Sequence, residues 1–468
     1  MARPCSVYPR RALFVAVAIL CLVGVSIPAW AQFETRATAA LPPGAFSIAG
    51  GDFNHDGFFD IVVIDDNGFT VSLGKGDGTF RKAVYYATPQ LTYSVAVGDF
   101  NNDGNLDIVF ANLDPSTVTV YLGNGDGTFQ APVSSNTTEG SYFVAVGNFN
   151  NDKNLDIAII DPPYISVLLG NGDGTFQAPS DNDSFPDAVW LAVGDFNNDH
   201  NLDVIAAGYS GSSYNVGVLL GNGNGTLADS ITTPLEYQPA SVAVGDLNGD
   251  GNLDAVVGDY LTGINVLLGN GNGTFQPAVN YEATGLSGYV MVDDLNRDGK
   301  PDVLLPTAVA EGPAGVDIFW GIGNGALRQA QFLRTGKDTG LPVVGDLNGD
   351  GLPDIALANG EAGAITMLNT GVVRFSPTTA PLSFSSPGEQ GLRLANNGTG
   401  PLSISSITAS GAAFEVRDTC GRSIQAGTSC DINVFFRPEG AGPYTGLVTL
   451  RDSASDNPQF IQLSGAAN

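Results

Sequence analysis

The stretch that organises this sequence is Asp246-Leu247-Asn248-Gly249-Asp250-Gly251-Asn252-Leu253-Asp254. It places oxygen-bearing side chains at positions 1, 3, 5 and 9, with a glycine at position 6, and position 7 can add its main-chain carbonyl. A hard cation such as Ca²⁺ binds about six to eight oxygen atoms, and an acidic loop with a sharp glycine turn can wrap around one. The stretch is therefore a candidate calcium loop.

The loop recurs seven times, and the copies are spaced 47 to 52 residues apart. They begin at Asp52, Asp99, Asn148, Asp195, Asp246, Asp294 and Asp346. In each unit the loop lies between two short apolar runs. A third run, a turn of the type Gly123-Asn124-Gly125-Asp126-Gly127 and a fourth run follow. Alternating apolar runs separated by Asn/Gly turns predict strands and hairpins.

Four short strands per unit of this length are typical of a propeller blade. We therefore predict an all-β chain with a seven-bladed β-propeller over residues 32–373. The last repeat ends after its third strand, near Met367-Leu368, and the chain from Gln32 to Thr35 matches the fourth strand of other repeats. We expect this N-terminal segment to complete the last blade, because closing the ring removes an exposed sheet edge.

The N-terminus has the features of an export signal. Arg3, Arg10 and Arg11 precede the apolar run 12–27, and Ala29-Trp30-Ala31 ends it. These features predict a secretory signal peptide over residues 1–31, and an uncleaved membrane anchor is the alternative. No second apolar span follows, so we expect a secreted, cell-surface or periplasmic chain with no membrane span after cleavage.

The region 374–468 lacks the repeat. Alternating strands at 402–404, 432–436 and 446–450 predict an immunoglobulin-like β-sandwich. Cys420 and Cys430 are the two cysteines left after signal cleavage, and in an exported chain they predict a disulfide.

The charge of the chain excludes one class of function. The sequence has 19 Lys and Arg residues against 48 Asp and Glu, a net charge of −29. A protein that binds nucleic acid through a basic surface needs the opposite balance, so no nucleic-acid partner is expected. With 43% hydrophobic residues the chain is predicted to fold, so its acids need another explanation.

The repeats resemble the FG-GAP or VCBS family, whose best-known relatives are the calcium-binding blades of integrin α-subunit propellers. The resemblance is carried by V-A-V-G-D-F-N-N-D-G-N-L-D-I-V-F at 95–110 and L-G-N-G-D-G-T-F at 122–129. The C-terminal region resembles immunoglobulin-like repeats of the abnormal-spindle and hydin type, through 394–402, 427–430 and 434–438. The resemblance implies that neither module is catalytic and that both serve adhesion, recognition or spacing.

The candidate calcium ligands are positions 1, 3, 5, 7 and 9 of each loop, and we expect six or seven structural Ca²⁺ sites. They are Asp52, Asn54, Asp56, Phe58, Asp60; Asp99, Asn101, Asp103, Asn105, Asp107; Asn148, Asn150, Asp152, Asn154, Asp156; Asp195, Asn197, Asp199, Asn201, Asp203; Asp246, Asn248, Asp250, Asn252, Asp254; Asp294, Asn296, Asp298, Lys300, Asp302; and Asp346, Asn348, Asp350, Leu352, Asp354.

Two loops depart from this pattern. Loop three has Asn148 at position 1 and Lys153 at the glycine position, which leaves its occupancy open. Loop four has His200 at the glycine position, where we expect a left-handed conformation that keeps the site. Zinc is a poorer candidate than calcium, because the donors are oxygens and the two histidines occupy non-ligand positions.

No catalytic motif stands out. The sequence has no G-x-S-x-G elbow, and the clustered aspartates, which could hydrolyse glycosides in pairs, are explained by metal. Strand parity places the metal loops on one face of the propeller and the strand 2–3 loops and blade crossovers on the other. The second face holds aromatic residues suited to protein or sugar recognition: Tyr93, Tyr142, Tyr164, Trp190, Tyr209, Tyr214, Tyr260 and Tyr289.

These observations predict an exported, calcium-binding, non-enzymatic recognition or adhesion protein. We expect a monomer whose propeller binds an extracellular protein or glycan. Two alternatives remain open: a carbohydrate-active enzyme or accessory, lyase or hydrolase, built on the propeller, and a lectin with one sugar pocket per blade.

Overall fold

The structure of the chain is a computed structural model. It describes residues 33–39, 47–65, 67–88, 91–210, 213–285, 288–307, 314–328, 330–335, 340–359, 363–369, 373–376, 382–396, 402–425, 428–452 and 459–467. The predicted signal peptide, residues 1–31, and Gln32 lie outside the described residues. Every regular element among the described residues is a strand, which confirms the all-β prediction. No helix among them is long and apolar enough to cross a membrane.

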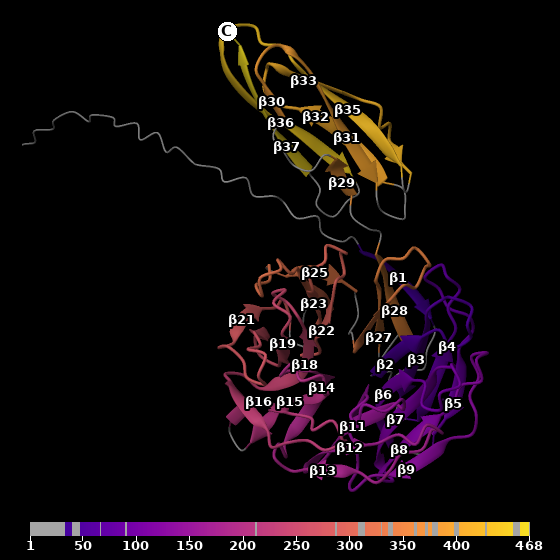
Figure 1. Cartoon of the computed structure of the whole chain (residues 1–468). Coiled ribbons are helices and arrows are strands. Elements are labelled where there is room, and N and C mark those ends of the chain that lie inside the picture. The colour runs from indigo at the N-terminus through magenta and orange to yellow at the C-terminus, as the bar shows by residue number, and fades with distance from the viewer. Residues whose placement is uncertain are drawn as a thin grey trace, which may run out of the picture.

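Seven antiparallel four-stranded sheets within the described residues form the blades of a propeller (Figure 1). Blade 1 is β2 (Ser47–Gly51), β3 (Asp60–Asp65), β4 (Gly68–Ser72) and β5 (Val84–Ala87); blade 2 is β6 (Leu91–Gly98), β7 (Asp107–Asp114), β8 (Thr117–Tyr121) and β9 (Val133–Asn136); blade 3 is β10 (Phe143–Gly147), β11 (Asp156–Asp161), β12 (Tyr164–Leu168) and β13 (Ser180–Asn182); blade 4 is β14 (Ala188–Gly194), β15 (Asp203–Ser210), β16 (Ser213–Leu219) and β17 (Ile231–Leu235). Blade 5 is β18 (Pro239–Gly245), β19 (Asp254–Asp259), β20 (Gly263–Leu267) and β21 (Val279–Glu282); blade 6 is β22 (Met291–Asp293), β23 (Asp302–Thr307), β24 (Gly315–Phe319) and β25 (Gln331–Arg334); blade 7 is β26 (Pro342–Gly345), β27 (Asp354–Asn359), β28 (Gly363–Asn369) and β1 (Phe33–Ala39).

Stacking of the blades explains the sequence pattern of the strands. The second strand of a blade, such as β3 or β19, is buried along its whole length and is apolar at successive positions. Both of its faces are covered, because each blade packs against a neighbour on either side. The fourth strands, such as β9 and β17, alternate between half-buried and exposed residues, as expected at the rim of the ring.

The N-terminal strand closes the ring as predicted. β1 pairs antiparallel with β28, with Phe33 opposite Asn369, so the first strand of the chain is the outer strand of the last blade (Figure 1). A shared apolar cluster also joins the two ends of the ring. In it Ile61 and Phe80 of blade 1 pack with Leu347 and Leu368 of blade 7. Closure thus protects an edge that would otherwise expose unpaired main-chain groups.

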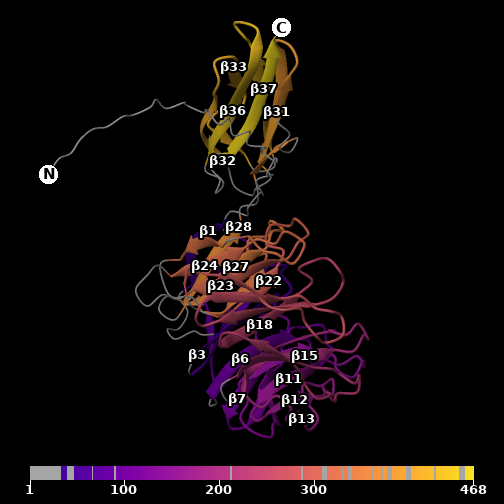
Figure 2. The same cartoon turned by 90° about the vertical axis from the view of Figure 1, so that its left-hand side faces the viewer.

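The C-terminal region is a separate two-sheet β-sandwich (Figures 1 and 2). One sheet has the order β29 (Val373–Ser376), β31 (Gly388–Asn396), β35 (Ser429–Phe436) and β33 (Phe414–Asp418). The other has the order β30 (Leu382–Phe384), β37 (Gln459–Ala467), β36 (Gly442–Asp452), β32 (Leu402–Ala409) and β34 (Ser423–Ile424). The domain boundary predicted after residue 373 falls one residue inside β29, which pairs with β31 of the sandwich.

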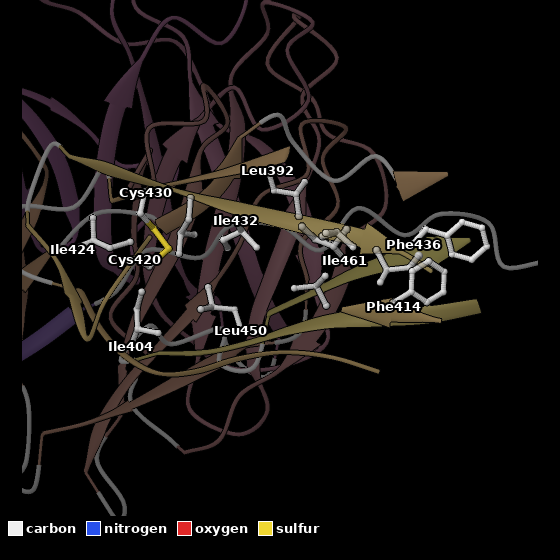
Figure 3. Packing of buried hydrophobic residues seen from close by; sticks show 14 of the residues in the cluster. Leu392, Ile404, Phe414, Cys420, Ile424, Cys430, Ile432, Phe436, Leu450 and Ile461 are labelled. Carbon is white, nitrogen blue, oxygen red and sulfur yellow. A yellow bond between two sulfur atoms is a disulfide. The ribbon is translucent and has the colours of Figure 1, made fainter. Parts of the chain in front are cut away.

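The sandwich has its own core and the predicted disulfide. Cys420 and Cys430 are bonded, with their Cα atoms 4.8 Å apart, and they join β35 to the loop after β33. Figure 3 shows this bond at one end of the core and the rings of Phe414 and Phe436 at the other, with centroids 5.1 Å apart. That this sandwich is specifically immunoglobulin-like stays a prediction.

Candidate functional site: the metal-loop face and the crossover face

The metal loops and the Gly/Asn turns lie on one face of the propeller, here called the metal-loop face, as strand parity predicted. In blade 2 the N–H of Gly127, in the turn, donates to the carbonyl of Phe53, in the loop of blade 1, over 3.0 Å. The same bond joins other neighbouring blades: Gly174 to Phe100, Gly225 to Phe149, Gly273 to Phe196, Gly325 to Leu247 and Gly78 to Leu347. The loops are therefore held in place by the adjacent blade.

Each regular loop is folded by its own carboxylates. In loop five, Asp246 Oδ1 accepts the N–H of Asp250 at 3.2 Å and Oδ2 accepts that of Gly251 at 2.9 Å. Asn248 Oδ1 also accepts the N–H of Asp250, and Asp250 Oδ1 accepts that of Asn252, both at 2.8 Å. The side chains of positions 1, 3 and 5 therefore converge on the middle of the loop. Position 6 must take positive φ for this turn, and Gly251 has φ 86°.

The two irregular loops behave differently. His200 in loop four adopts φ 70°, and its N–H donates to Asp195 Oδ2 at 2.8 Å, so the predicted left-handed conformation of His200 is confirmed. Loop three is rearranged. Lys153 is not among the positive-φ residues of the described chain, and Asn148 donates its side-chain amide to the carbonyl of Asp152. Asn148 Oδ1 is left buried without a hydrogen-bond partner, so this loop lacks the geometry of the others.

The aspartate at position 9 has a role that the sequence analysis did not assign. In loop five, Asp254 Oδ1 accepts the N–H of Gly269 at 2.7 Å and Oδ2 accepts that of Leu247 at 2.9 Å. The carboxylate thus ties the loop to the end of the third strand. Equivalent pairs of bonds occur at Asp60, Asp107, Asp156, Asp203, Asp302 and Asp354. Loop three lacks the acid at position 1 and the glycine at position 6, but it has the aspartate at position 9, Asp156. An aspartate at position 9 in all seven loops is the sequence signal that could have revealed this structural role.

Burial of these carboxylates makes their ionisation costly. Desolvation, with a smaller contribution from the acids at positions 1 and 5, raises the pKa of Asp60, Asp107 and Asp203 to about 6, that of Asp354 to about 7 and that of Asp302 to about 8. Main-chain N–H donors partly oppose this rise. The side chains at positions 1 and 5 are thus close enough to the ninth carboxylate to repel it.

The donor set of the regular loops fits a hard cation at positions 1, 3 and 5, which present carboxylate and amide oxygens. In loop seven, Asp350 Oδ2 is buried and has no hydrogen-bond partner. Among the described residues, however, no group of three or more His, Cys, Asp or Glu side chains is arranged to hold a metal ion. In loop five, both oxygens of the position 1 and position 9 carboxylates already accept main-chain N–H groups. Each oxygen has a second lone pair, so the ninth position can contribute only in addition to those bonds.

Neighbouring loops also touch through side chains at positions 4 and 7. His55 Nε2 lies 2.9 Å from Asn105 Oδ1, and Asn102 donates to Asn154 over 3.0 Å. The same contact joins Asn151 to Asn201 and Asn198 to Asn252. Four successive contacts thus link the loops of blades 1 to 5. The sequence pattern does not reveal these contacts, because the partners are about one repeat apart.

The opposite face, here called the crossover face, carries the strand 2–3 loops and the blade crossovers. Its prominent feature is a set of rings from five blades, here called the aromatic row: Tyr93, Tyr142, Trp190, Tyr209, Tyr260 and Tyr289. The ring centroids of Tyr93 and Tyr142 are 5.5 Å apart, as are those of Trp190 and Tyr289. Burial raises the pKa of Tyr260 and Tyr289, and repulsion from Tyr209 at Tyr260 and from Tyr260 at Tyr289 adds to the rise. Tyr164 and Tyr214, predicted for the same face, lie on the third strands of blades 3 and 4.

A pocket opens within the aromatic row, between blades 3 and 4. Its volume is about 410 Å³, and its lining includes Tyr142, Pro162, Pro186, Asp187 and Tyr209. Two main-chain hydrogen bonds fix its walls: Tyr142 N–H donates to the Ile160 carbonyl, and Tyr209 N–H donates to the Asp187 carbonyl. The pocket is therefore built on the ends of strands and on the crossover from blade 3 to blade 4.

Comparison with known proteins places the repeats in a family. The FG-GAP-like repeat family matches residues 52–110, 99–159, 148–206, 195–257, 250–305 and 294–357. Among curated proteins, none matches the chain significantly. A similar solved structure is that of a lectin from Agrocybe aegerita, described for its specific recognition of non-reducing terminal N-acetylglucosamine. It is 21% identical, with a TM-score of 0.46, over 62% of this chain and 80% of that one. The matched repeats span more than half of the sequence, so the chain belongs to the FG-GAP-like repeat family.

Proposed function

We propose that this chain is an exported, non-enzymatic recognition protein that binds an extracellular partner through the crossover face of its propeller. The observation that carries the proposal is the aromatic row. Four of its tyrosines, which come from four successive blades, are 40 to 44% exposed. Rigid aromatic side chains supply contact area at a small entropic cost, and a half-exposed group of them marks an interaction surface.

The chemistry of the metal-loop face supports a structural role for its acids. The carboxylates at positions 1, 5 and 9 of loop five accept hydrogen bonds from the main chain of their own blade. An acid used in catalysis must face a substrate. These acids instead hold the hairpin and the third strand together, which is the reason for proposing that the face is not an active site.

We propose in addition that Ca²⁺ binds the six loops other than loop three, held by the side chains of positions 1, 3 and 5 and the carbonyl of position 7. Calcium supplies positive charge that offsets the repulsion among carboxylates, and this stabilises the folded chain because the unfolded chain has no preformed site. The test is thermal unfolding with calcium and with excess EDTA. We expect a lower melting temperature in EDTA, and an unchanged one would overturn the calcium proposal.

Export is proposed from the N-terminal segment, and the disulfide between Cys420 and Cys430 is consistent with an oxidising compartment. N-terminal sequencing of the chain recovered from outside the producing cells should begin at Gln32. A chain retaining residues 1–31 would favour the membrane anchor.

The recognition proposal is tested by array binding. The calcium-loaded chain is applied to arrays of extracellular proteins and of glycans, together with Tyr260→Ala on the crossover face and Asn124→Ala on the metal-loop face. We expect the signal of the bound partner to fall for Tyr260→Ala alone. A signal lost only with Asn124→Ala would overturn the assignment of the face, and depolymerisation of a polysaccharide panel by the chain would overturn the non-enzymatic assignment.

A further inference from the structure

We infer that the crossover face binds a neutral saccharide chain, one sugar ring of which sits in the pocket lined by Tyr142 and Tyr209. The inference rests on the proposed function and adds the chemistry of the ligand and its position on the face. It has three supports, which are the shape of the pocket, the extent of the aromatic row and the distribution of charge.

The pocket has the size and lining of a sugar site. A volume of about 410 Å³ lies within the range of small-ligand pockets, roughly 300 to 1,000 Å³. Tyrosine and proline rings offer flat apolar surfaces against which the C–H groups of a pyranose can pack, while the Asp187 carboxylate and the tyrosine hydroxyls can bind sugar hydroxyls. Tyr142 and Tyr209 are 43% and 40% exposed, so their rings are accessible to a ligand.

The aromatic row extends well beyond the pocket, which favours a chain over a single sugar. Tyr142 contacts Tyr93 of blade 2 on one side of the pocket. On the other side, Tyr209 in β15 of blade 4 and Tyr260 just after β19 of blade 5 occupy equivalent places in adjacent blades, where their N–H groups donate to the carbonyls of Asp187 and Gln238. A ligand that follows these rings contacts several blades at once. The row also differs from seven equivalent pockets, because its rings come only from blades 2 to 6 and from two kinds of position, at the start of a first strand or at the end of a second strand.

The charge of this part of the propeller excludes anionic saccharides. Lys153 is the only Lys or Arg between Lys82 and Arg297, and it lies in metal loop three, on the opposite face. Among the described residues, those lining the pocket include Asp187 and no cationic side chain. A uronic-acid or sulfated chain would therefore meet an acidic surface with no counter-charge, and the net charge of −29 adds long-range repulsion.

A basic protein is the competing ligand that this charge allows. A protein partner would use a broad, flat contact that buries on the order of 800 Å² of each surface. Two rings of the aromatic row, Tyr142 and Tyr209, instead line a concave pocket, and the exposed tyrosines of the row carry hydroxyl groups. These features favour the saccharide.

The test is calorimetric titration of the calcium-loaded chain with neutral hexasaccharides (cellohexaose, mannohexaose and chitohexaose) and with hexagalacturonate. We expect binding of at least one neutral hexamer and none of hexagalacturonate. Tyr142→Ala and Tyr209→Ala should each weaken binding roughly tenfold, since each removes one stacking ring. Tyr142→Phe, which keeps the ring, should bind nearly as well as the unmodified chain.

Tyr85→Ala is the matched control. Tyr85 is 46% exposed on β5, the outer strand of blade 1, away from the aromatic row, and its replacement should leave binding unchanged. The melting temperature of each variant shows that it is folded. Failure of all three neutral hexamers to bind, equal binding of hexagalacturonate, or undiminished binding by both alanine variants would overturn the inference.

Two further results separate this inference from the proposed function. If a basic protein binds instead, and Tyr142→Ala abolishes that binding, the saccharide inference falls while the recognition face stands. If a partner binds and only metal-loop-face variants weaken it, both fall.

Discussion

The side-chain amide of Asn369 donates a hydrogen bond of 2.7 Å to the main-chain carbonyl of Leu295, in the metal loop of the preceding blade. In the other blades, the main-chain carbonyl at the same position of the metal loop, position 2, accepts the N–H of a turn glycine. Blade 7 ends its third strand at Asn369, and the chain leaves the propeller there. One asparagine therefore replaces a whole turn, because its side chain supplies the missing donor while its N–H binds Asp354 Oδ1 at 2.6 Å.

Replacing Asn369 by Ala should destabilise the propeller by about 1–3 kcal/mol, because the buried Leu295 carbonyl loses its donor. The N–H bond to Asp354 is kept, so the variant isolates the side chain. The urea midpoint of unfolding measures the effect. Asn124→Ala, which removes an exposed amide from the turn of blade 2, is the control, with an expected change of about 0.5 kcal/mol or less. Equal midpoints for the two variants would contradict the prediction.

Asp254→Asn and Asp250→Asn should separate the acid that holds the loop to the blade from the acid that we propose binds calcium. Asp254 is fully buried and binds two N–H groups, whereas an asparagine has one acceptor oxygen, so about 1–3 kcal/mol should be lost with or without calcium. Asp250→Asn should reduce mainly the stabilisation gained on adding calcium. Thermal unfolding of both variants in calcium and in EDTA distinguishes the two roles. If Asp254→Asn unfolds like the unmodified chain in EDTA, the ninth acid has no structural role.

The double replacement Asn148→Asp with Lys153→Gly should add one calcium site. The first change supplies a carboxylate to accept the N–H groups of the loop, and the second allows the positive φ that Gly251 adopts in loop five. Calcium stoichiometry from calorimetric titration should rise by one. Asp195→Asn in loop four, the reverse change, should lower it by one. An unchanged stoichiometry in the double variant would mean that loop three already binds calcium or is held by other contacts.

Asp161, outside the metal loops, should contribute a pH dependence of stability. Burial, assisted by repulsion from Asp181, raises its pKa from 3.8 to about 6, although the N–H groups of Thr138 and Glu139 oppose the shift. A carboxyl group whose pKa is higher in the folded chain than in the unfolded chain stays protonated to a higher pH in the folded chain. Stability should therefore fall as pH rises from about 4 to about 6, by up to roughly 3 kcal/mol.

Denaturant unfolding across this pH range measures that slope. Asp161→Asn should remove the contribution of Asp161 from it, and Asp181→Asn should reduce it in part, by removing the neighbouring charge. A slope that is the same in all three proteins would contradict the assignment.

Much of the fold follows from local patterns. Alternating apolar runs predicted the strands, the Asn/Gly turns predicted the hairpins, and the repeat count predicted the blades. The segment after Gln32 predicted ring closure, which β1 and β28 confirm. The pair Cys420 and Cys430 was also identified correctly. These features depend on residues that are close in sequence, or on a repeat that appears when the units of the chain are aligned with one another.

The role of each site residue was harder to predict. Asp254 was predicted to be a metal ligand at position 9 of the loop, because its spacing from Asp246 suits one. Its hydrogen-bond partner Gly269, however, lies beyond the end of the third strand of the blade. Position 4 residues such as Asn198 reach a loop 54 residues away. The aromatic row likewise joins rings of different blades, so its existence depends on the angle between blades.

The sequence by itself determined the strands, the loops and their repetition, because each depends on local main-chain preferences and on the alternation of buried and exposed side chains. Only the tertiary structure decided which acids fold the loop and which hold it to the blade, and which aromatic residues meet on the crossover face. The physical reason is that these contacts join residues that stacking of the blades brings together. Burial of apolar strands drives the stacking, and it does not depend on which acids or aromatic rings lie at the ends of those strands.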